Sequence, residues 1–200
     1  MKKEKPVLAV LGGIGSGKTT VSNLLLGEKG WLFSADQEAH LLLETPDVVE
    51  KLISFFGKDI LSGDGLINRK VLGERVFPDK VGLDYLESIL HPLIRKKALE
   101  FIEKGQNTHD CTHLLLDIPL LLEKNWRNLC TILVFVKCGD EKRLQRVRGR
   151  NWNEGELEIR ENAQFPLTTK ESISDYIIDN SAELDQTRQQ AADLLKLILP

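Results

Sequence analysis

Short apolar runs recur along the chain and predict the strands of a buried sheet. Each run is rich in Val, Ile, Leu or aromatic side chains and is bounded by polar or turn-forming residues. Continuous apolar runs of this kind are typical of parallel strands that are covered on both faces. The runs are Val7–Leu11, Trp31–Phe33, His113–Asp117, Thr131–Val136 and Tyr176–Ile178.

Helical periodicity fills the segments between these runs. Val21, Leu24 and Leu25 recur at helical spacing within residues 20–29, and an amphipathic pattern over residues 184–199 closes the chain. Strands that alternate with helices predict an α/β domain around a five-stranded parallel sheet with right-handed crossovers. We see no internal repeat and no low-complexity segment.

The long stretch over residues 38–104 is helical in pattern and contains no evident strand. Thr45 and Asn68 are expected to cap two of its helices, and His91-Pro92 is expected to open the last one. The stretch is far longer than a single crossover helix. We therefore interpret residues 35–106 as a helical insertion above the strand ends, where a second substrate would be held.

Glycines dominate the junction between the first strand and the first helix. The segment reads G-G-I-G-S-G-K-T and fits the P-loop pattern G-x-x-x-x-G-K-[ST]. Glycine lets backbone N–H groups turn inward around phosphate oxygens, the lysine charge suits the β- and γ-phosphates, and the threonine hydroxyl suits Mg²⁺. The helix that follows adds the positive end of its dipole. The predicted ATP-binding residues are Gly12, Gly13, Ile14, Gly15, Ser16, Gly17, Lys18, Thr19 and Thr20.

A dinucleotide-binding fold is a competing interpretation, because Asp36 follows at about 20 residues, where an acid would bind ribose. The glycine spacing excludes this fold. The pattern G-x-G-x-x-G cannot be placed on Gly12, Gly13, Gly15 and Gly17, and Lys-Thr at the helix start indicates a nucleoside triphosphate.

Composition and charge argue against several classes of binding partner for this protein. A net charge of −3 and a pI near 5.9 give no electrostatic footprint for nucleic acid or anionic membranes. The three cysteines form no C-x-x-C pair and are interpreted as free residues in a reducing compartment. The apolar run Val7–Leu11 is too short for a secretory signal, and no segment approaches the ~18 apolar residues of a membrane span. We expect a cytoplasmic protein that is a monomer or weak oligomer.

Two acids follow predicted strands, at the edge where ligands collect in open α/β folds. Asp36 comes just after the second run and is interpreted as a chemically active carboxylate, a role compatible with the alternative that it is the N-cap of the next helix. Asp117 ends the third run and is placed where P-loop enzymes bind Mg²⁺. The predicted metal ligands are Thr19 and Asp117.

A charged helix is predicted from Asp140 to Arg150. Arg143, Arg146 and Arg150 fall on one face of it, and Arg148 points away. A solvated face and a nucleic-acid surface are the generic interpretations of such a run. With a P-loop present we favour a lid over residues 138–174 whose guanidinium groups bind phosphate.

An ordered set of motifs extends the P-loop over nearly the whole chain. The set comprises L-G-G-I-G-S-G-K-T at Leu11–Thr19, A-D at Ala35-Asp36, F-G-x-x-I-L-x-x-D-G at Phe56–Gly65, N-R-x-x-L at Asn68–Leu72, H-P-L-I at His91–Ile94, D-I-P-L-L-L-E at Asp117–Glu123, Q-F-P-L-T-T-K at Gln164–Lys170 and I-I-D-N at Ile177–Asn180. With this set the sequence resembles the bacterial dephospho-CoA kinases. This chain departs from many relatives in having Ser34 where they have a first Asp, and Leu11 where Thr is frequent.

The resemblance implies a P-loop NTPase-type three-layer sandwich with core segments 1–34, 107–137 and 175–200. It implies transfer of the ATP γ-phosphoryl group to the 3′-hydroxyl of dephospho-CoA, with Mg²⁺. It further implies catalytic roles for Lys18, Asp36, Arg146 and Arg150, and acceptor binding by Asp36, Arg69, His91 and Gln164. From the residues alone, a lone His before Pro is more often a structural turn residue, and contact with a substrate is favoured over metal binding for His91.

Rival functions share part of this pattern. A P-loop kinase for a nucleoside or nucleoside monophosphate would use the same site with another acceptor. A GTP-dependent switch protein would carry an N-K-x-D guanine motif, which this sequence lacks. A nucleic-acid-dependent ATPase disagrees with the acidic charge balance.

Overall fold

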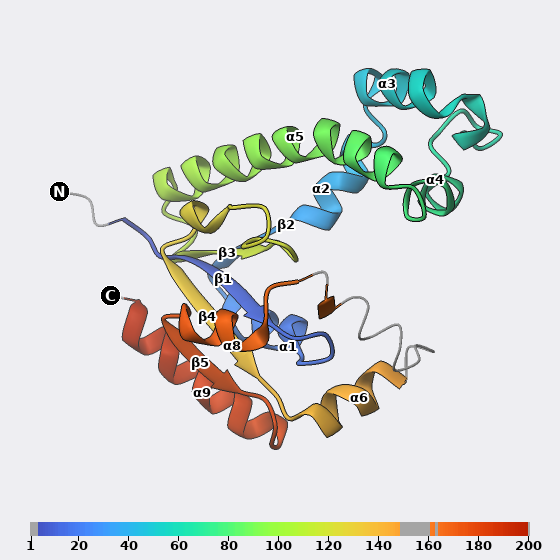
Figure 1. Cartoon of the computed structure of the whole chain (residues 1–200). Coiled ribbons are helices and arrows are strands. Elements are labelled where there is room, and N and C mark those ends of the chain that lie inside the picture. The colour runs from blue at the N-terminus through green and yellow to red at the C-terminus, as the bar shows by residue number, and fades with distance from the viewer. Residues whose placement is uncertain (1–3, 149–160, 163, 200) are drawn as a thin grey trace. The chain divides into compact units, whose positions relative to one another are not determined.

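The computed structural model describes residues 4–148, 161–162 and 164–199 (Figure 1). These residues divide into two compact units, Met1–Phe33 with Phe101–Pro200 and Ser34–Glu100. Each unit is considered by itself below. In the described helices, none is long and apolar enough to cross a membrane.

The first unit is built on a five-stranded parallel sheet in the order β2-β3-β1-β4-β5. The central pairs place Leu8 of β1 opposite Leu115 of β3 and Ile132 of β4. All five predicted strands are confirmed, and each predicted end lies within one residue of the observed end. Their bounds are β1 Val7–Gly12, β2 Gly30–Ser34, β3 His113–Asp117, β4 Ile132–Lys137 and β5 Tyr176–Asp179.

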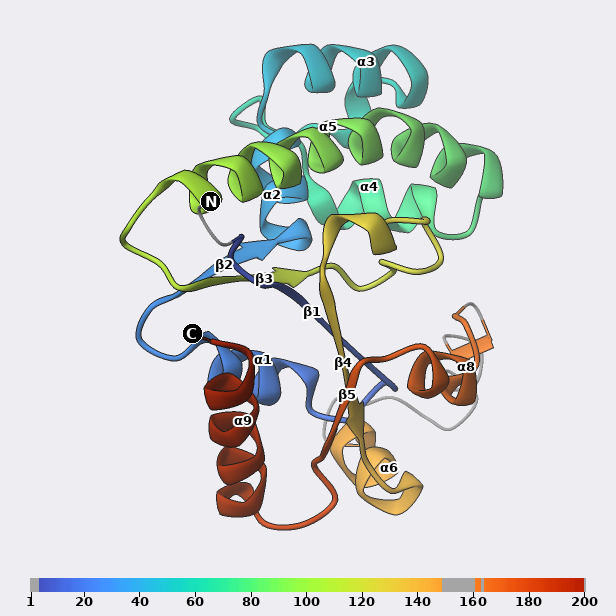
Figure 2. The same cartoon turned by 90° about the vertical axis from the view of Figure 1, so that its left-hand side faces the viewer.

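Helices cover both faces of this sheet, which makes the predicted three-layer sandwich. On one face lie α1 (Lys18–Leu26) and α9 (Leu184–Ile198), side by side in Figures 1 and 2. The other face carries α8 (Leu167–Ser172) and the last turns of α5 (Lys80–Asn107), whose Gly105 lies directly against Leu114. This unit also contains α6 (Asp140–Arg148) and a 3₁₀ turn at Arg127–Leu129.

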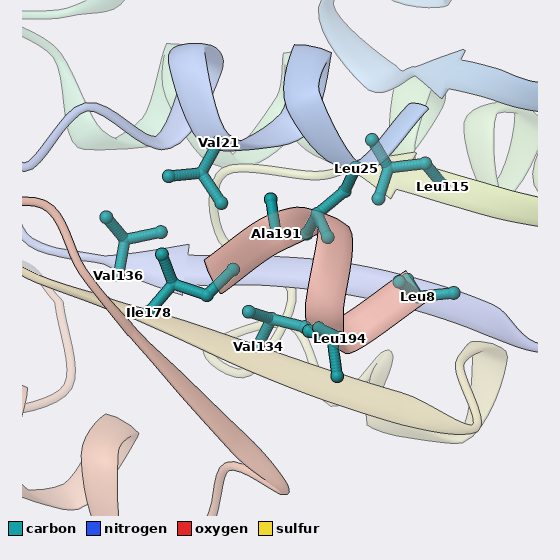
Figure 3. Packing of buried hydrophobic residues seen from close by; sticks show 9 residues of the cluster. All are labelled: Leu8, Val21, Leu25, Leu115, Val134, Val136, Ile178, Ala191 and Leu194. Atoms are coloured by element: carbon teal, nitrogen blue, oxygen red, sulfur yellow. The ribbon is translucent and has the colours of Figure 1, made fainter. Parts of the chain in front are cut away.

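The core between the sheet and the α1–α9 layer follows the two-residue alternation of strand side chains. Figure 3 shows these side chains meeting between the ribbons. Burying one such Leu or Val stabilises the fold by about 1.5–3 kcal/mol. The cluster consists of Leu8, Val21, Leu25, Leu115, Val134, Val136, Ile178, Ala191 and Leu194.

A buried histidine joins β3 to α1 in this core. The Nε2 of His113 lies 2.7 Å from the carbonyl oxygen of Leu25, and its Nδ1 lies 2.9 Å from the Thr112 hydroxyl. The Leu25 carbonyl can only accept, so Nε2 carries the proton and Nδ1 accepts from Thr112. Burial lowers the pKa of His113 below its ordinary 6.5, against the opposing effect of the Leu25 hydrogen bond.

This lowered pKa predicts an acid-sensitive stability. Below pH 6.5 the unfolded chain takes up a proton on His113 before the folded chain does, so stability falls as the pH falls from 6.5 toward the folded-state pKa. When the pH is lowered from 7.5 to 5.5, the Tm of His113→Gln should fall less than the Tm of the parent chain. The two falls should differ by about 2–4 °C for each kcal/mol of stability that the parent loses through protonation of His113. Thermal melts at both pH values measure this. The control His109→Gln changes an exposed histidine and should melt like the parent at both; equal behaviour of the two variants would contradict the prediction.

The second unit is helical, as predicted. It contains α2 (Ala35–Leu42), α3 (Pro46–Phe56), a 3₁₀ turn at Lys58–Ile60, α4 (Arg69–Val76) and most of α5. Gly57 ends α3 with φ 83°, and the Asn68 side chain caps α4 by accepting from the amide of Val71 at 3.2 Å. Phe55 of α3 stacks on Tyr85 of α5 with ring centroids 4.0 Å apart.

One boundary was wrong. His91-Pro92 does not open a new helix, because α5 runs unbroken from Lys80 to Asn107 with Pro92 inside it. Proline removes one backbone hydrogen bond and disfavours the helix interior. However, Leu90, Ile94 and Ala98 form one buried stripe at four-residue spacing that continues across Pro92. Burial on both sides of the proline therefore outweighs its local preference to break the helix.

Candidate active site at the P-loop

The P-loop connects the carboxyl end of β1 to the first turn of α1. Gly15 and Gly17 have φ of 77° and 92°, in the left-handed region that side chains other than glycine rarely adopt. A Cβ on Gly17 would also lie 2.2 Å from the Nδ2 of Asn180. The glycines are therefore required both by the backbone conformation and by the closeness of neighbouring side chains.

Three carbonyl groups of the loop, those of Ile14, Gly15 and Ser16, point outward to donors from other parts of the chain. Nε of Arg143 donates to the oxygen of Ile14 at 3.0 Å, and Nη1 of Arg146 donates to the oxygens of Gly15 and Ser16 at 3.2 and 3.0 Å. Since a trans peptide group is planar, an outward carbonyl turns the following N–H inward. The amides of Gly15 and Gly17 accordingly face the inside of the loop, where an anion would sit.

Asn180 completes this outer support. It follows β5, and its Nδ2 donates to the oxygen of Ser16 at 2.8 Å. Its own Oδ1 accepts from the Thr187 hydroxyl at 3.0 Å, which fixes the amide orientation. Sequence reasoning did not assign Asn180 to the site. The available signal was its position just past the last strand, at the same edge of the sheet as the loop.

Lys18 lies across the loop that it follows. Its Nζ donates to the carbonyl oxygens of Gly12 and Gly13 at 3.0 and 2.9 Å. The side chain of Ser16 is 1% exposed, and its hydroxyl has no hydrogen-bond partner in the described part of the chain. Inward amides, one ammonium group and a buried hydroxyl are the donors that a chain of phosphate groups accepts from.

The predicted metal ligands are an exposed hydroxyl and an exposed carboxylate. Thr19 lies in the first turn of α1, and Asp117 ends β3, which pairs with β1 up to Ala9. Within the described residues, no cluster of three or more His, Cys, Asp or Glu side chains could hold a metal. One carboxylate and one hydroxyl fit Mg²⁺, which keeps several waters and binds substrate phosphates.

The predicted arginine face is only partly described. Arg143 and Arg146 of α6 both contact the P-loop, as given above, while Arg150 lies outside the described residues. Arg143 is 5% exposed, whereas Arg146 is exposed. Both guanidinium groups contact the outer side of the loop in this structure.

The segment around Gln164 is held by an ion pair between the buried Lys170 and the partly exposed Glu123. Nζ of Lys170 lies 3.0 Å from Oε1 of Glu123 and 2.9 Å from Oε1 of Gln164, and the same Glu123 oxygen accepts from the amide of Phe165 at 2.8 Å. Burial alone would raise the pKa of Glu123, but the hydrogen bonds from Phe165 and Lys170 outweigh it and leave that pKa below its usual value. A cavity of about 450 Å³ lies here, lined by Glu161, Asn162, Gln164, Phe165, Pro166 and Leu167.

The other predicted acceptor residues belong to the second unit. Asp36 is exposed in the first turn of α2, and the N-cap of that helix is Ser34, whose hydroxyl accepts from the amide of Gln37 at 3.4 Å. The N-cap interpretation of Asp36 is therefore wrong. Arg69 is exposed at the start of α4, and Nε2 of His91 lies 3.9 Å from Oε1 of Glu87.

Comparison with known proteins agrees on one family. The sequence profile described as CoaE, dephospho-CoA kinase, matches residues 6–186. A protein of Carboxydothermus hydrogenoformans named dephospho-CoA kinase is 37% identical over 198 residues, covering 96% of this chain and 93% of its own length. The fold is similar to the crystal structure of TT1252 from Thermus thermophilus, with TM-score 0.79, 28% identity and coverage of 98% and 99%. It is also similar to a dephospho-CoA kinase from Campylobacter jejuni, with TM-score 0.71, 27% identity and 98% coverage of both chains.

Proposed function

The chain belongs to the dephospho-CoA kinase family, and on that premise we propose how its residues phosphorylate dephospho-CoA in the final step of coenzyme A biosynthesis. The observation that carries the proposal is the P-loop, whose carbonyls are held outward by Arg143, Arg146 and Asn180 while Lys18 spans it. A loop preorganised in this way binds the phosphates of ATP without reorganising when the reaction occurs.

In the proposed reaction the γ-phosphoryl group moves from ATP to the ribose 3′-hydroxyl. The 3′ oxygen forms a bond to the γ-phosphorus as the bond from that phosphorus to the β–γ bridging oxygen breaks, and ADP leaves. Lys18 and the loop amides neutralise the charge that builds on the bridging and γ oxygens. Thr19 and Asp117 would hold Mg²⁺, which shields the phosphate charges when bound.

Asp36 is the proposed base. Its carboxylate is exposed in the first turn of α2, directly after β2, at the edge of the sheet where ligands collect in this class of fold. It accepts the proton of the 3′-hydroxyl as the new P–O bond forms. Since Ser34 stands where many relatives carry a first acid, Asp36 performs this role without an acidic neighbour before Ala35.

The acceptor would be held by Arg69, His91 and Gln164. Arg69 offers an exposed guanidinium at the start of α4, which suits a phosphate of dephospho-CoA. The side-chain oxygen of Gln164 accepts from Lys170, so its NH₂ group is left to donate in another direction. Arg146 and Arg150 are proposed to neutralise the transferred group once a lid over residues 138–174 closes and excludes water.

An acceptor assay tests the function. ADP release is measured with Mg-ATP and, in turn, dephospho-CoA, AMP, CMP and adenosine, with Lys18→Met as the blank for contaminating kinases. Dephospho-CoA should be preferred in kcat/KM by at least about a hundredfold, because a site that binds the acceptor through polar groups rejects analogues that lack their partners. A preference for AMP, CMP or adenosine would establish the nucleoside or nucleotide kinase instead.

We also propose that the protein is cytoplasmic and is a monomer or weak oligomer. The three cysteines are free thiols, and Cys111 and Cys130 are buried. This supports the expectation of a reducing, cytoplasmic compartment. A monomer or weak oligomer that binds neither membranes nor nucleic acid is likewise still a prediction.

A further inference from the structure

One buried arginine connects three separate parts of the first unit. Arg143 of α6 donates from Nε to the Ile14 oxygen of the P-loop at 3.0 Å and from Nη1 to Oδ1 of Asp140 at 2.9 Å. Its Nη2 forms an ion pair with Oε1 of Glu161, which precedes α8. The side chain of Arg143 is 6% exposed. A single rigid guanidinium group therefore contacts the loop, its own helix and the segment that precedes α8.

The two carboxylates differ in how well they neutralise this charge. The Asp140 side chain is 86% exposed, so water screens its attraction for Arg143. Glu161 is 32% exposed, but its contacting oxygen and Nη2 of Arg143 are both shielded from water and have no other hydrogen-bond partner among the described residues. A buried charge needs a close partner to offset its lost hydration. Glu161 is that partner.

The guanidinium group also lies directly against the loop backbone. A Cβ on Gly13 would be 2.8 Å from both Cζ and Nε of Arg143, and a Cβ on Gly15 would be 2.7 Å from the Arg143 carbonyl oxygen. Because the group is planar and rigid, a displacement of Nη2 moves Nε as well. The Ile14 carbonyl, which sets the direction of the Gly15 amide, is thus mechanically connected to Glu161.

We infer that Glu161 is a positioning residue that acts through Arg143 on the phosphate-binding loop and thereby sets the affinity for ATP and ADP. When Glu161 is in place, Arg143 holds the Ile14 carbonyl outward and the loop is ready for phosphate. Without the Glu161 carboxylate, Arg143 keeps only the exposed carboxylate of Asp140, and the Ile14 carbonyl loses the firmly held donor that keeps it outward. This inference rests on the nucleotide-binding part of the proposed function and not on the identity of the acceptor.

Matched neutral variants of the two carboxylates test it. Glu161→Gln and Asp140→Asn each remove one negative charge from the same guanidinium group while keeping the size of the side chain. Calorimetric titration with Mg-ADP should give a Kd about tenfold higher for Glu161→Gln and within about twofold of the parent for Asp140→Asn. The KM for ATP should rise with Kd, while the KM for dephospho-CoA should stay within about twofold of the parent, a split that general loosening of the fold would not produce.

A double-mutant cycle identifies Arg143 as the intermediary. Arg143→Gln keeps an N–H group that can reach toward the loop but removes the charge that needs Glu161. The double variant should bind Mg-ADP no more weakly than Arg143→Gln alone, since the effect of Glu161 passes through Arg143. If Glu161→Gln does not fold, Glu161→Asp keeps the charge on a shorter side chain and should raise Kd by a smaller factor, again relative to Asp140→Asn.

Three results would overturn the inference: equal effects of Glu161→Gln (or Glu161→Asp) and Asp140→Asn, a parallel rise of both KM values, or additivity in the cycle. The proposed function fails separately. A parent chain that does not bind Mg-ADP, or that binds it and leaves dephospho-CoA unphosphorylated, contradicts the function. A parent that does both, with variants that bind ADP like the parent, contradicts only the role of Glu161.

Discussion

Replacing Lys18 by Met is expected to lower kcat for CoA formation by about 10²–10³-fold, the loss that follows removal of one transition-state donor. Nζ of Lys18 donates to the carbonyls of Gly12 and Gly13. When a triphosphate enters, we expect this ammonium group to exchange those carbonyls for phosphate oxygens. Because the charge on those oxygens grows along the reaction, the lysine stabilises the transition state more than bound ATP. Single-turnover measurements, with enzyme in excess over dephospho-CoA and with saturating Mg-ATP, give the rate constant of the chemical step, which should fall by the same factor.

The conservative control for this experiment is Lys18→Arg. It keeps the charge but presents it in a planar fork that does not match the point contact of an ammonium group. Its kcat should fall between those of the parent and Lys18→Met. Both variants should retain the melting temperature of the parent within a few degrees, because the Gly12 and Gly13 carbonyls that Lys18 contacts belong to the loop and not to the core. Near-normal kcat of Lys18→Met would contradict the proposed role of Lys18 and its loop in the phosphoryl transfer.

Asp36→Asn is the second large effect. The substitution keeps the size of the side chain and its place in the first turn of α2 but removes the group that accepts the 3′-hydroxyl proton. A positioned base contributes about 10²–10⁴-fold, so kcat should fall by that factor while the Kd for Mg-ADP stays within about twofold of the parent.

Glu38→Gln is the matched control for Asp36→Asn. Asp36 and Glu38 are both acids of the first turn of α2, so each contributes similarly to the helix dipole. Only Asp36 is proposed to touch the substrate, and Glu38→Gln should therefore keep kcat within about twofold of the parent. If both variants lost activity equally, the carboxylate of Asp36 would be acting on the helix and not as a base. Near-normal turnover of Asp36→Asn at saturating substrates would end the assignment outright.

Local sequence signals succeeded where the physical cause is itself local. The run His113–Asp117 predicted β3 with its observed bounds, because a short buried strand is recognised by its own apolar residues. Gly57 and Asn68 marked helix ends for the same reason, since a left-handed φ and a side-chain cap involve only neighbouring residues. The P-loop belongs to this class as well.

The predictions that were wrong or missing concern features that residues close in the sequence do not determine. Pro92 indicated a helix boundary that α5 does not have, because the buried stripe across it depends on residues that pack together only in the folded chain. Ser34 rather than Asp36 caps α2, a choice between two good capping residues that local propensity does not distinguish. Asn180 and Arg143 were not recognised as supports of the loop, since each is more than a hundred residues away from it.

By itself the sequence determined the succession of strands and helices along the chain, the glycine-rich loop with Lys18 behind it, and the family to which the chain belongs. These depend on residue types at fixed short spacings. Only the tertiary structure decided which donors hold the loop carbonyls outward and that Arg143 faces Glu161. Those contacts join α6, β5 and the segment before α8 to a loop near the start of the chain, and their energy depends on burial, which exists only once the sheet has assembled.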